Sequence, residues 1–165
     1  MNEQERTVMF LRGLIDDEPQ WVHEALAKGA SPTLPIGFDL GNKESWRPPI
    51  SYACAEAGLE IFEALLDKGA EINVIHSETG DNLLHLVVAD THYPYECYLN
   101  GETWDGRLEK LLKDKVAMAK ILLKKGVSPY HKNKRGKTPF DFADKFDEII
   151  AVMKQYKPEI KIAKC

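Results

Sequence analysis

The chain has 165 residues, of which 44% are hydrophobic and 29% are charged, and its formal net charge is −4. A chain of this length and composition is typical of one globular domain with a real core, and it is too short for two domains of ordinary size. The acidic balance gives no overall indication of a nucleic-acid or anionic-membrane partner. The longest apolar runs are well short of the about 20 residues that a membrane span needs.

The cysteines and the first residues of the chain indicate its compartment. Cys54, Cys97 and Cys165 show no paired spacing, which predicts reduced thiols in a reducing environment. The first residues have mixed charge, and the apolar stretch after them is short and interrupted by Arg12, unlike a signal peptide. We therefore expect a cytoplasmic protein.

Three stretches end alike, as an amphipathic helix followed by glycine. They cover residues 24–30, 63–70 and 120–127, and the glycines are Gly29, Gly69 and Gly126. Glycine accepts the left-handed conformation that ends a helix, so each stretch predicts a helix end. The first stretch is the end of an expected helix at residues 20–28, and a further helix is expected at residues 7–15. The acids between them, Asp16 and Asp17, predict a turn and a helix cap.

A second recurring motif predicts where other helices begin. It covers residues 48–53, 82–87 and 138–143. Proline suits the first helical turn because the N–H that it lacks would have no partner there. Thr138, directly before Pro139, is the expected N-cap of the last of these helices.

Together the two motifs resemble the ankyrin repeat, which begins Gly-x-Thr-Pro-Leu-His-x-Ala and ends Leu-Leu-x-x-Gly-Ala. Pro49 and Gly69 stand 20 residues apart, as in that family. Gly80 and Gly136 each precede a helix start by two residues, where the family has its hairpin glycine. Of the three motif histidines only His85 is retained, and the resemblance implies that it hydrogen-bonds the adjacent hairpin backbone.

The resemblance implies an all-α solenoid of stacked helix pairs with hairpin loops. We expect a single ankyrin-repeat domain with repeats at about residues 5–34, 44–76, 78–132 and 134–156 and a tail at 157–165. Terminal repeats are expected to be atypical because one side of each faces water. The residues to which we assign a structural role are Gly29, Gly69, Gly80, His85, Gly126, Gly136, Thr138 and Pro139.

Two departures from the family pattern stand out. Gly29 and Gly69 are 40 residues apart, against roughly 33 in the family. The extra residues lie in the loop 33–46, and Trp46 replaces the hairpin glycine, so the first hairpin is expected to be irregular. The second departure is an insertion of about 23 residues, at about 91–113, which lengthens the third repeat.

The insertion begins with aromatic, turn-forming residues and ends with a helical pattern. Its Asn100–Gly101 pair is a strong tight-turn signal, and helical spacing starts at Arg107. We therefore expect a loop or short hairpin, followed by a helix extended by about two turns. Two roles stay open for the aromatic side chains: anchoring a partner, or packing on the neighbouring helix. These side chains are Tyr93, Tyr95, Tyr98 and Trp104.

The resemblance also implies a partner-binding strip, made of residues near the hairpin glycines and near the ends of the first helices. The strip changes from acidic in its middle to basic at its C-terminal end, which favours a charged partner. Together with the four aromatic residues of the insertion, the candidates are Glu44, Ser45, Trp46, Arg47, Ala55, Glu56, Glu78, Thr79, Asp81, Ala89, Asp90, Lys134, Arg135, Lys137, Lys145 and Phe146.

Three functional hypotheses follow. The first is a protein-binding module, monomeric on its own, and in its sharper form a stoichiometric inhibitor such as a bacterial immunity or antitoxin-type protein. The second is a small enzyme or metal site on the insertion, using His92, Cys97 and Asp105, although no zinc spacing or nucleophile motif is present. The third is a binder of nucleic acid or anionic lipid through residues 120–137, which hold seven Lys or Arg and no acid. We favour the first, and expect no catalytic residue, metal or cofactor.

Overall fold

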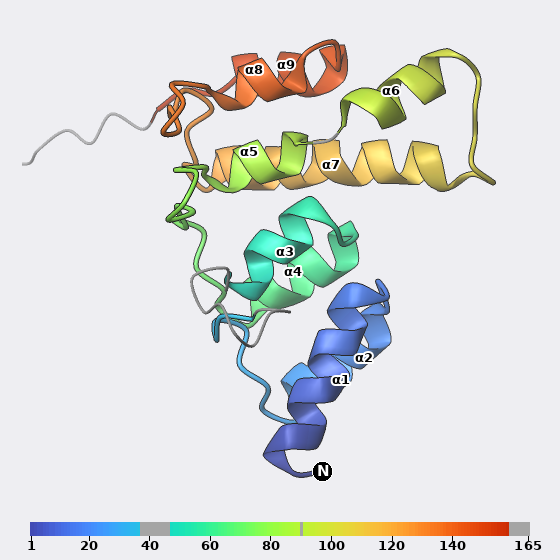
Figure 1. The fold of residues 1–165 in the computed structure, drawn as a ribbon, viewed down its shortest axis with the longest axis vertical. Helices are drawn as coiled ribbons and strands as arrows, with labels where there is room; N and C mark the ends of the chain where they lie inside the picture. The colour runs from blue at the N-terminus through green and yellow to red at the C-terminus, as the bar shows by residue number, and fades with distance from the viewer. Residues whose placement is uncertain (37–46, 90, 159–165) are drawn as a thin grey trace, which may run out of the picture. The chain divides into compact units, whose positions relative to one another are not determined.

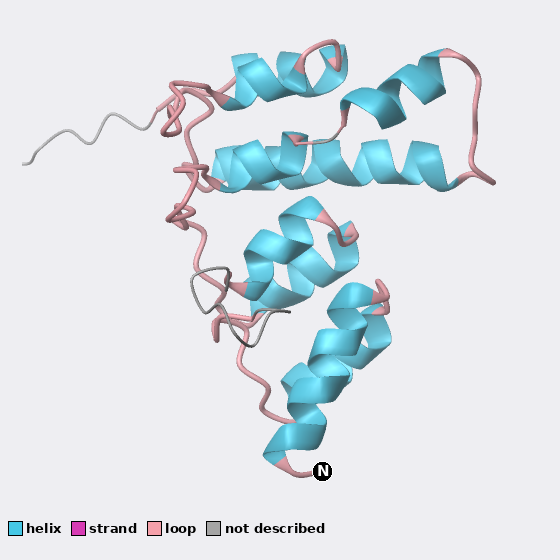
Figure 2. Ribbon diagram, in the orientation of Figure 1, coloured by secondary structure: helices cyan, strands magenta, loops and turns pink. Residues whose placement is uncertain are grey.

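The computed structural model describes residues 1–36, 47–89 and 91–158, and for His92 and Tyr93 the backbone only. Within these ranges it has nine α-helices and no β-strand (Figures 1 and 2). Isolated bridges are the only strand-like features in these ranges; one is antiparallel and joins Ile36 to Arg47, and Ile75 and Asn82 are also bridge residues. The expectation of an all-α protein is therefore confirmed.

The chain divides into two compact units, residues 1–78 and 79–165. The first unit holds α1 (Glu3–Ile15), α2 (Pro19–Ala27), α3 (Pro49–Ala55) and α4 (Leu59–Asp67). Helix α1 packs against α2 and α3 against α4, and the two pairs meet through α1 with α3 and α2 with α4. Its core consists of fully or almost fully buried apolar side chains, among them Phe10, Leu14, Val22, Ile50, Ile61, Phe62 and Leu65.

The turn between α1 and α2 also positions the next pair. Asp16 is the C-cap of α1. Asp17 adopts a left-handed conformation, with φ of 51°, and its Oδ1 accepts a hydrogen bond of 2.8 Å from the backbone N–H of Gly58. Gly58 is the N-cap of α4. A carboxylate of one helix pair therefore caps a helix of the next, where an acceptor is needed because the first N–H groups of a helix have no partner within it.

The second unit holds α5 (Leu83–Val88), α6 (His92–Leu99), α7 (Arg107–Lys124), α8 (Pro139–Ala143) and α9 (Asp147–Lys154). Helix α5 packs against α7 and α8 against α9, while α5 also contacts α8 and α7 contacts α9. The first helices of the two pairs are therefore neighbours, and so are the second helices (Figure 1). Thr138 is the N-cap of α8, and Asp141 accepts hydrogen bonds from its N–H and its hydroxyl group.

Three helices end in the same way in the two units. Gly29, Gly69 and Gly126 follow α2, α4 and α7 with φ of 92°, 87° and 93°. After each glycine, the next backbone N–H bonds the carbonyl oxygen five residues earlier: Ala30 to Ala25, Ala70 to Leu65, and Val127 to Leu122, at 2.9–3.0 Å. This is the hydrogen-bond pattern that a left-handed glycine permits at a helix end.

The insertion differs from the expected loop or short hairpin, because residues 92–99 form helix α6. Pro94 lies in its first turn, where a missing N–H costs little. Asn100 is the C-cap, Gly101 has a φ of 81°, and Glu102 N–H bonds the carbonyl oxygen of Cys97 at 3.0 Å. The Asn-Gly pair therefore ends a helix here and does not form a hairpin turn. Helix α7 begins at Arg107, as predicted, and runs for 18 residues.

No helix in the part of the chain that the structure describes is long and apolar enough to cross a membrane. Cys54 and Cys97 are buried, and neither is part of a disulfide bond.

Candidate functional site

Two loops of the second unit are held together ahead of α5 and α8. We call residues 79–82 and 131–138 the paired loops. The backbone N–H of Lys134 donates to the carbonyl oxygen of Thr79 at 2.9 Å. Nε2 of His131 donates to the carbonyl oxygen of Gly80 at 2.8 Å. Hydrogen bonds therefore join the backbone of the first loop to the second, although Gly80 and His131 are 51 residues apart in the sequence.

Asn133 organises the second of the paired loops. Its side-chain oxygen accepts hydrogen bonds from the backbone N–H groups of Arg135 and Lys137, at 2.9 and 3.0 Å. Its side-chain nitrogen donates to Oδ1 of Asp81 at 2.8 Å. Asn133 is only 5% exposed, so these bonds are shielded from competing water. The sequence prediction did not include Asn133; its place three residues before Gly136 was the available signal.

His85 joins the paired loops to α5. Its Nε2 donates to the carbonyl oxygen of Lys137 at 2.9 Å, and its Nδ1 accepts from the backbone N–H of Asn82 at 3.2 Å. The ring is 1% exposed and packs edge-on against Phe142, with centroids 5.4 Å apart. Burial lowers the pKa of His85, although the Lys137 carbonyl and the Asp81 carboxylate oppose this shift. A neutral imidazole with its proton on Nε2 suits these two bonds.

The close approach of the loops requires glycine at residue 80. Gly80 has a φ of 75°, and a Cβ atom there would lie 2.9 Å from the backbone nitrogen of Lys134 and 3.0 Å from its Cγ. Any other residue would be strained and would also push the loops apart.

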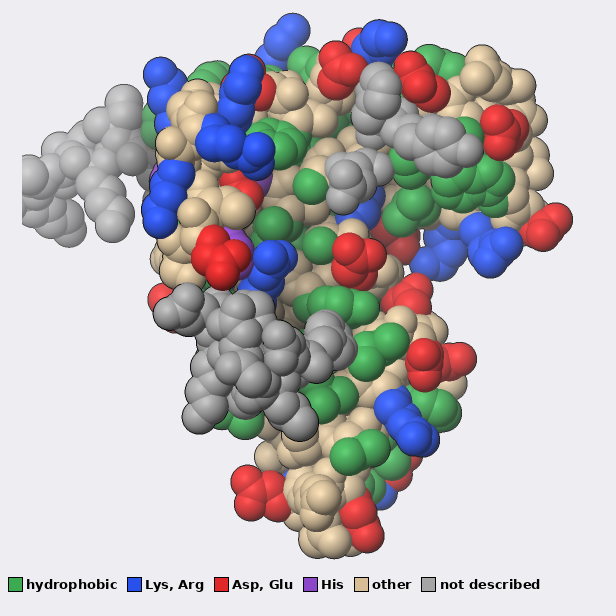
Figure 3. All heavy atoms as spheres, in the orientation of Figure 1, with side chains coloured by type: hydrophobic (Ala, Val, Ile, Leu, Met, Phe, Trp, Pro, Cys, Tyr) green, Lys and Arg blue, Asp and Glu red, His purple; other side chains and the backbone are tan. Residues whose placement is uncertain are grey.

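The paired loops bring together five of the predicted contact residues. Lys134, Arg135 and Lys137 are exposed, and Thr79 is half-buried. Asp81 is only 8% exposed and its carboxylate receives the Asn133 amide, so it supports the loops and offers little surface to a partner. Figure 3 shows Lys and Arg side chains gathered at the end of the second unit where Figure 1 places these loops.

Other predicted contact residues lie elsewhere. Glu56 and Glu78 are exposed in the first unit, where Ala55 is half-buried. Arg47 is half-buried there, and its backbone N–H and carbonyl both bond Ile36 at 2.8 Å. Ala89, in the second unit, is also half-buried. Glu44, Ser45, Trp46 and Asp90 lie outside the described residues, as does the side chain of Tyr93.

The remaining aromatic residues of the insertion have three different environments. Tyr95 is half-buried and its ring stacks on Phe146, a residue that is 2% exposed. Tyr98 is 47% exposed. Trp104 is half-buried, and its Nε1 donates to Glu102 at 3.2 Å. An ion pair of 3.5 Å between Lys145 and Glu96 adds a second link from α6 to the segment between α8 and α9.

The insertion also borders a small hollow of about 70 Å³, lined by Tyr95, Tyr98 and Phe146 among others. Cys97 is buried on α6 and Asp105 is exposed in the turn before α7. Among the described residues there is no group of three or more His, Cys, Asp or Glu that could hold a metal ion.

Neither a protein-family model nor a curated protein matches this chain.

Proposed function

We propose that the chain is an ankyrin-type repeat protein that binds another protein through the exposed side of the paired loops. The observation that carries the proposal is the Asn133 network, which holds the loop backbone in place while Lys134, Arg135 and Lys137 stay exposed. A loop that is already ordered loses less conformational entropy on binding than a free loop does.

Two features of the helices support the ankyrin assignment. Helix ends after α2, α4 and α7 share the same glycine geometry and the same hydrogen bond. Within the second unit the first helices of two pairs are neighbours, as are the second helices. Such stacking buries the apolar side of a helix pair that could not bury it alone.

The excess of Lys and Arg in the part of the chain that contains the paired loops favours a partner whose surface carries carboxylates. Residues 79–165 hold 16 Lys and Arg against 12 Asp and Glu, whereas residues 1–78 hold 6 against 14. A basic region attracts an acidic partner over a distance of about 8 Å at physiological salt, and raises the association rate more than the affinity.

The test compares two variants with the same change in charge. Lys134→Gln with Arg135→Gln removes two cations from the paired loops, and Lys28→Gln with Lys68→Gln removes two exposed cations from the first unit. The tagged wild-type chain is used to capture a partner from a lysate of its own cells, and calorimetry then measures affinity and stoichiometry.

We expect a protein partner in a fixed ratio, bound at least about tenfold more weakly by the loop variant and unchanged by the control. A one-to-one ratio would fit the inhibitor form of the hypothesis. Recovery of no stoichiometric protein, or equal binding by both variants, contradicts the proposal. Material lost on nuclease treatment would favour the nucleic-acid hypothesis instead.

A further inference from the structure

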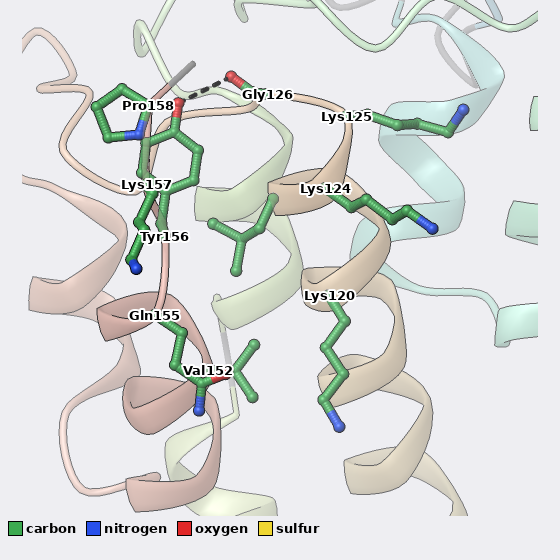
Figure 4. A pocket seen from close by; sticks show the side chains of 10 residues that line it. Lys120, Lys124, Lys125, Gly126, Val152, Gln155, Tyr156, Lys157 and Pro158 are labelled. Carbon is green, nitrogen blue, oxygen red and sulfur yellow. Dashed lines mark hydrogen bonds between the residues drawn. The ribbon is translucent and has the colours of Figure 1, made fainter. Parts of the chain in front are cut away.

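A cationic groove lies between the C-terminal ends of α7 and α9, and no residue of the paired loops lines it. Its volume is about 630 Å³, which is within the usual range for ligand pockets of about 300–1,000 Å³. Lys120, Lys124 and Lys125 come from the α7 side, and Tyr156 and Lys157 from the segment after α9, with Val152 between them (Figure 4). Leu123 adds a second apolar side chain to the lining.

The groove lysines differ from the lysines at the other end of α7. There, Lys110 pairs with Asp114 at 2.8 Å, and Lys113 pairs with Glu109 at 2.7 Å. None of the four groove lysines forms an ion pair within the described ranges. Lys110 and Lys113 near the start of α7 are therefore ion-paired, whereas the lysines beside the groove have no ion pair among the described residues.

A hydrogen bond fixes the wall opposite α7. The Tyr156 hydroxyl donates to the carbonyl oxygen of Gly126 at 3.3 Å, which ties the segment after α9 to the end of α7 (Figure 4). Lys157, the next residue after Tyr156, also lines the groove, although it lies three residues beyond the end of α9.

Helix stability accounts for only part of this cluster. A lysine in the last turn of a helix interacts favourably with the helix dipole, and this explains Lys124 and its neighbour Lys125. Lys120 lies a full turn earlier, and Lys157 lies outside any helix. The helix dipole therefore does not explain why Lys120 and Lys157 lie beside the groove.

We propose that this groove binds an acidic segment of a partner protein, independently of the paired loops. Carboxylates of the segment would pair with the lysines, and an apolar side chain would contact Leu123 and Val152. A compact phosphate suits the site less well, because it has no apolar part to contact Leu123 and Val152. A long polyanion extends beyond the groove and is repelled by the net charge of −4 of the whole chain. A short peptide contacts the groove alone.

The experiment measures fluorescence anisotropy of the full chain with a labelled peptide of alternating Glu and Leu. The same peptide with Gln in place of Glu is the uncharged control probe. The groove variant is Lys120→Gln with Lys124→Gln, and its charge-matched control is Lys28→Gln with Lys68→Gln, two exposed lysines of the first unit. Lys157→Gln gives a second groove variant outside any helix, and circular dichroism checks that each variant is folded.

We expect the Glu peptide to bind the wild-type chain, with an affinity that falls as salt rises. The double groove variant should bind at least about tenfold more weakly, Lys157→Gln should weaken binding in the same direction, and the control variant should bind as the wild type does. Absence of peptide binding, or an equal loss in the control variant, overturns the proposal. So does tighter binding of a labelled oligodeoxythymidine or of phosphatidylserine vesicles through the same lysines. None of these results affects partner capture through the paired loops.

Discussion

The ring of Tyr95 lies against the ring of Phe146, with centroids 4.7 Å apart and planes inclined by 29°. Tyr95 belongs to the insertion, and Phe146 is the N-cap residue of α9, so the contact joins two segments that are 51 residues apart. The insertion is therefore part of the packing of the second unit.

Replacing Tyr95 should destabilise the protein. Tyr95→Ala removes a ring that covers the buried Phe146, and we expect the free energy of unfolding to fall by about 2 kcal/mol. Tyr98→Ala on the same helix is the matched control, since Tyr98 is 47% exposed; its effect should stay within about 0.5 kcal/mol. Urea denaturation measures both. Equal losses for the two variants would show that the stacking contact has no special weight.

Gly13→Ala should be unfavourable, although the exchange usually stabilises a helix by about 1 kcal/mol. A Cβ atom at this position of α1 would lie 2.8 Å from Cγ2 of Val22 and 2.9 Å from its backbone nitrogen. Helices α1 and α2 would have to move apart, and we expect a net loss of about 1–3 kcal/mol. Thr7→Ala, on an exposed part of α1, should be nearly neutral by comparison. A thermal melt of each variant gives the sign, and a higher melting temperature for Gly13→Ala would refute the close packing.

His85 should make stability depend on pH. Burial places its pKa below the ordinary value of 6.5, so the unfolded chain binds the proton more readily than the folded chain. The contribution of His85 is therefore fully present above pH 6.5 and declines as the pH falls through this value toward the lowered one. Urea unfolding between about pH 8 and pH 5 should show a steeper loss for the wild type than for His85→Gln, which cannot titrate there. Parallel pH profiles for the two proteins would be inconsistent with a lowered pKa.

Asp17→Ala should weaken the first unit by removing the acceptor for Gly58 N–H. Loss of a comparable capping group costs about 1 kcal/mol, and alanine is also less suited than aspartate to the φ of 51°. Asp17→Asn keeps an acceptor oxygen and tolerates the same backbone, so it should recover most of the loss. Chemical denaturation measures all three proteins. If Asn behaves like Ala, then negative charge, and not the hydrogen bond, is what matters at this position.

Local signals predicted the helices well where one residue controls the backbone. Gly29, Gly69 and Gly126 end their helices because glycine adopts positive φ at little cost, a property visible in the sequence. The Asn100–Gly101 pair was misleading, since the same two residues suit a hairpin turn and a helix end. Which one forms depends on the contacts that α6 makes with distant parts of the unit.

The candidate site was harder to predict from the sequence than the helices were, because it too depends on contacts between residues that are far apart in the chain. Exposure of Lys134, Arg135 and Lys137 follows from their charge. That Asp81 is buried could not be foreseen, because its partner Asn133 is 52 residues away. The lysine groove likewise needs α7 and the segment after α9 side by side.

The conformation of the loop held by Asn133 does not depend on the side chains at positions 135 and 137. Asn133 bonds the main-chain N–H groups at positions 135 and 137, which every residue except proline possesses. Side chains at these two positions can therefore change while the loop keeps its form. Natural or laboratory variation at positions 135 and 137 can therefore change the surface of this loop while the fold is kept.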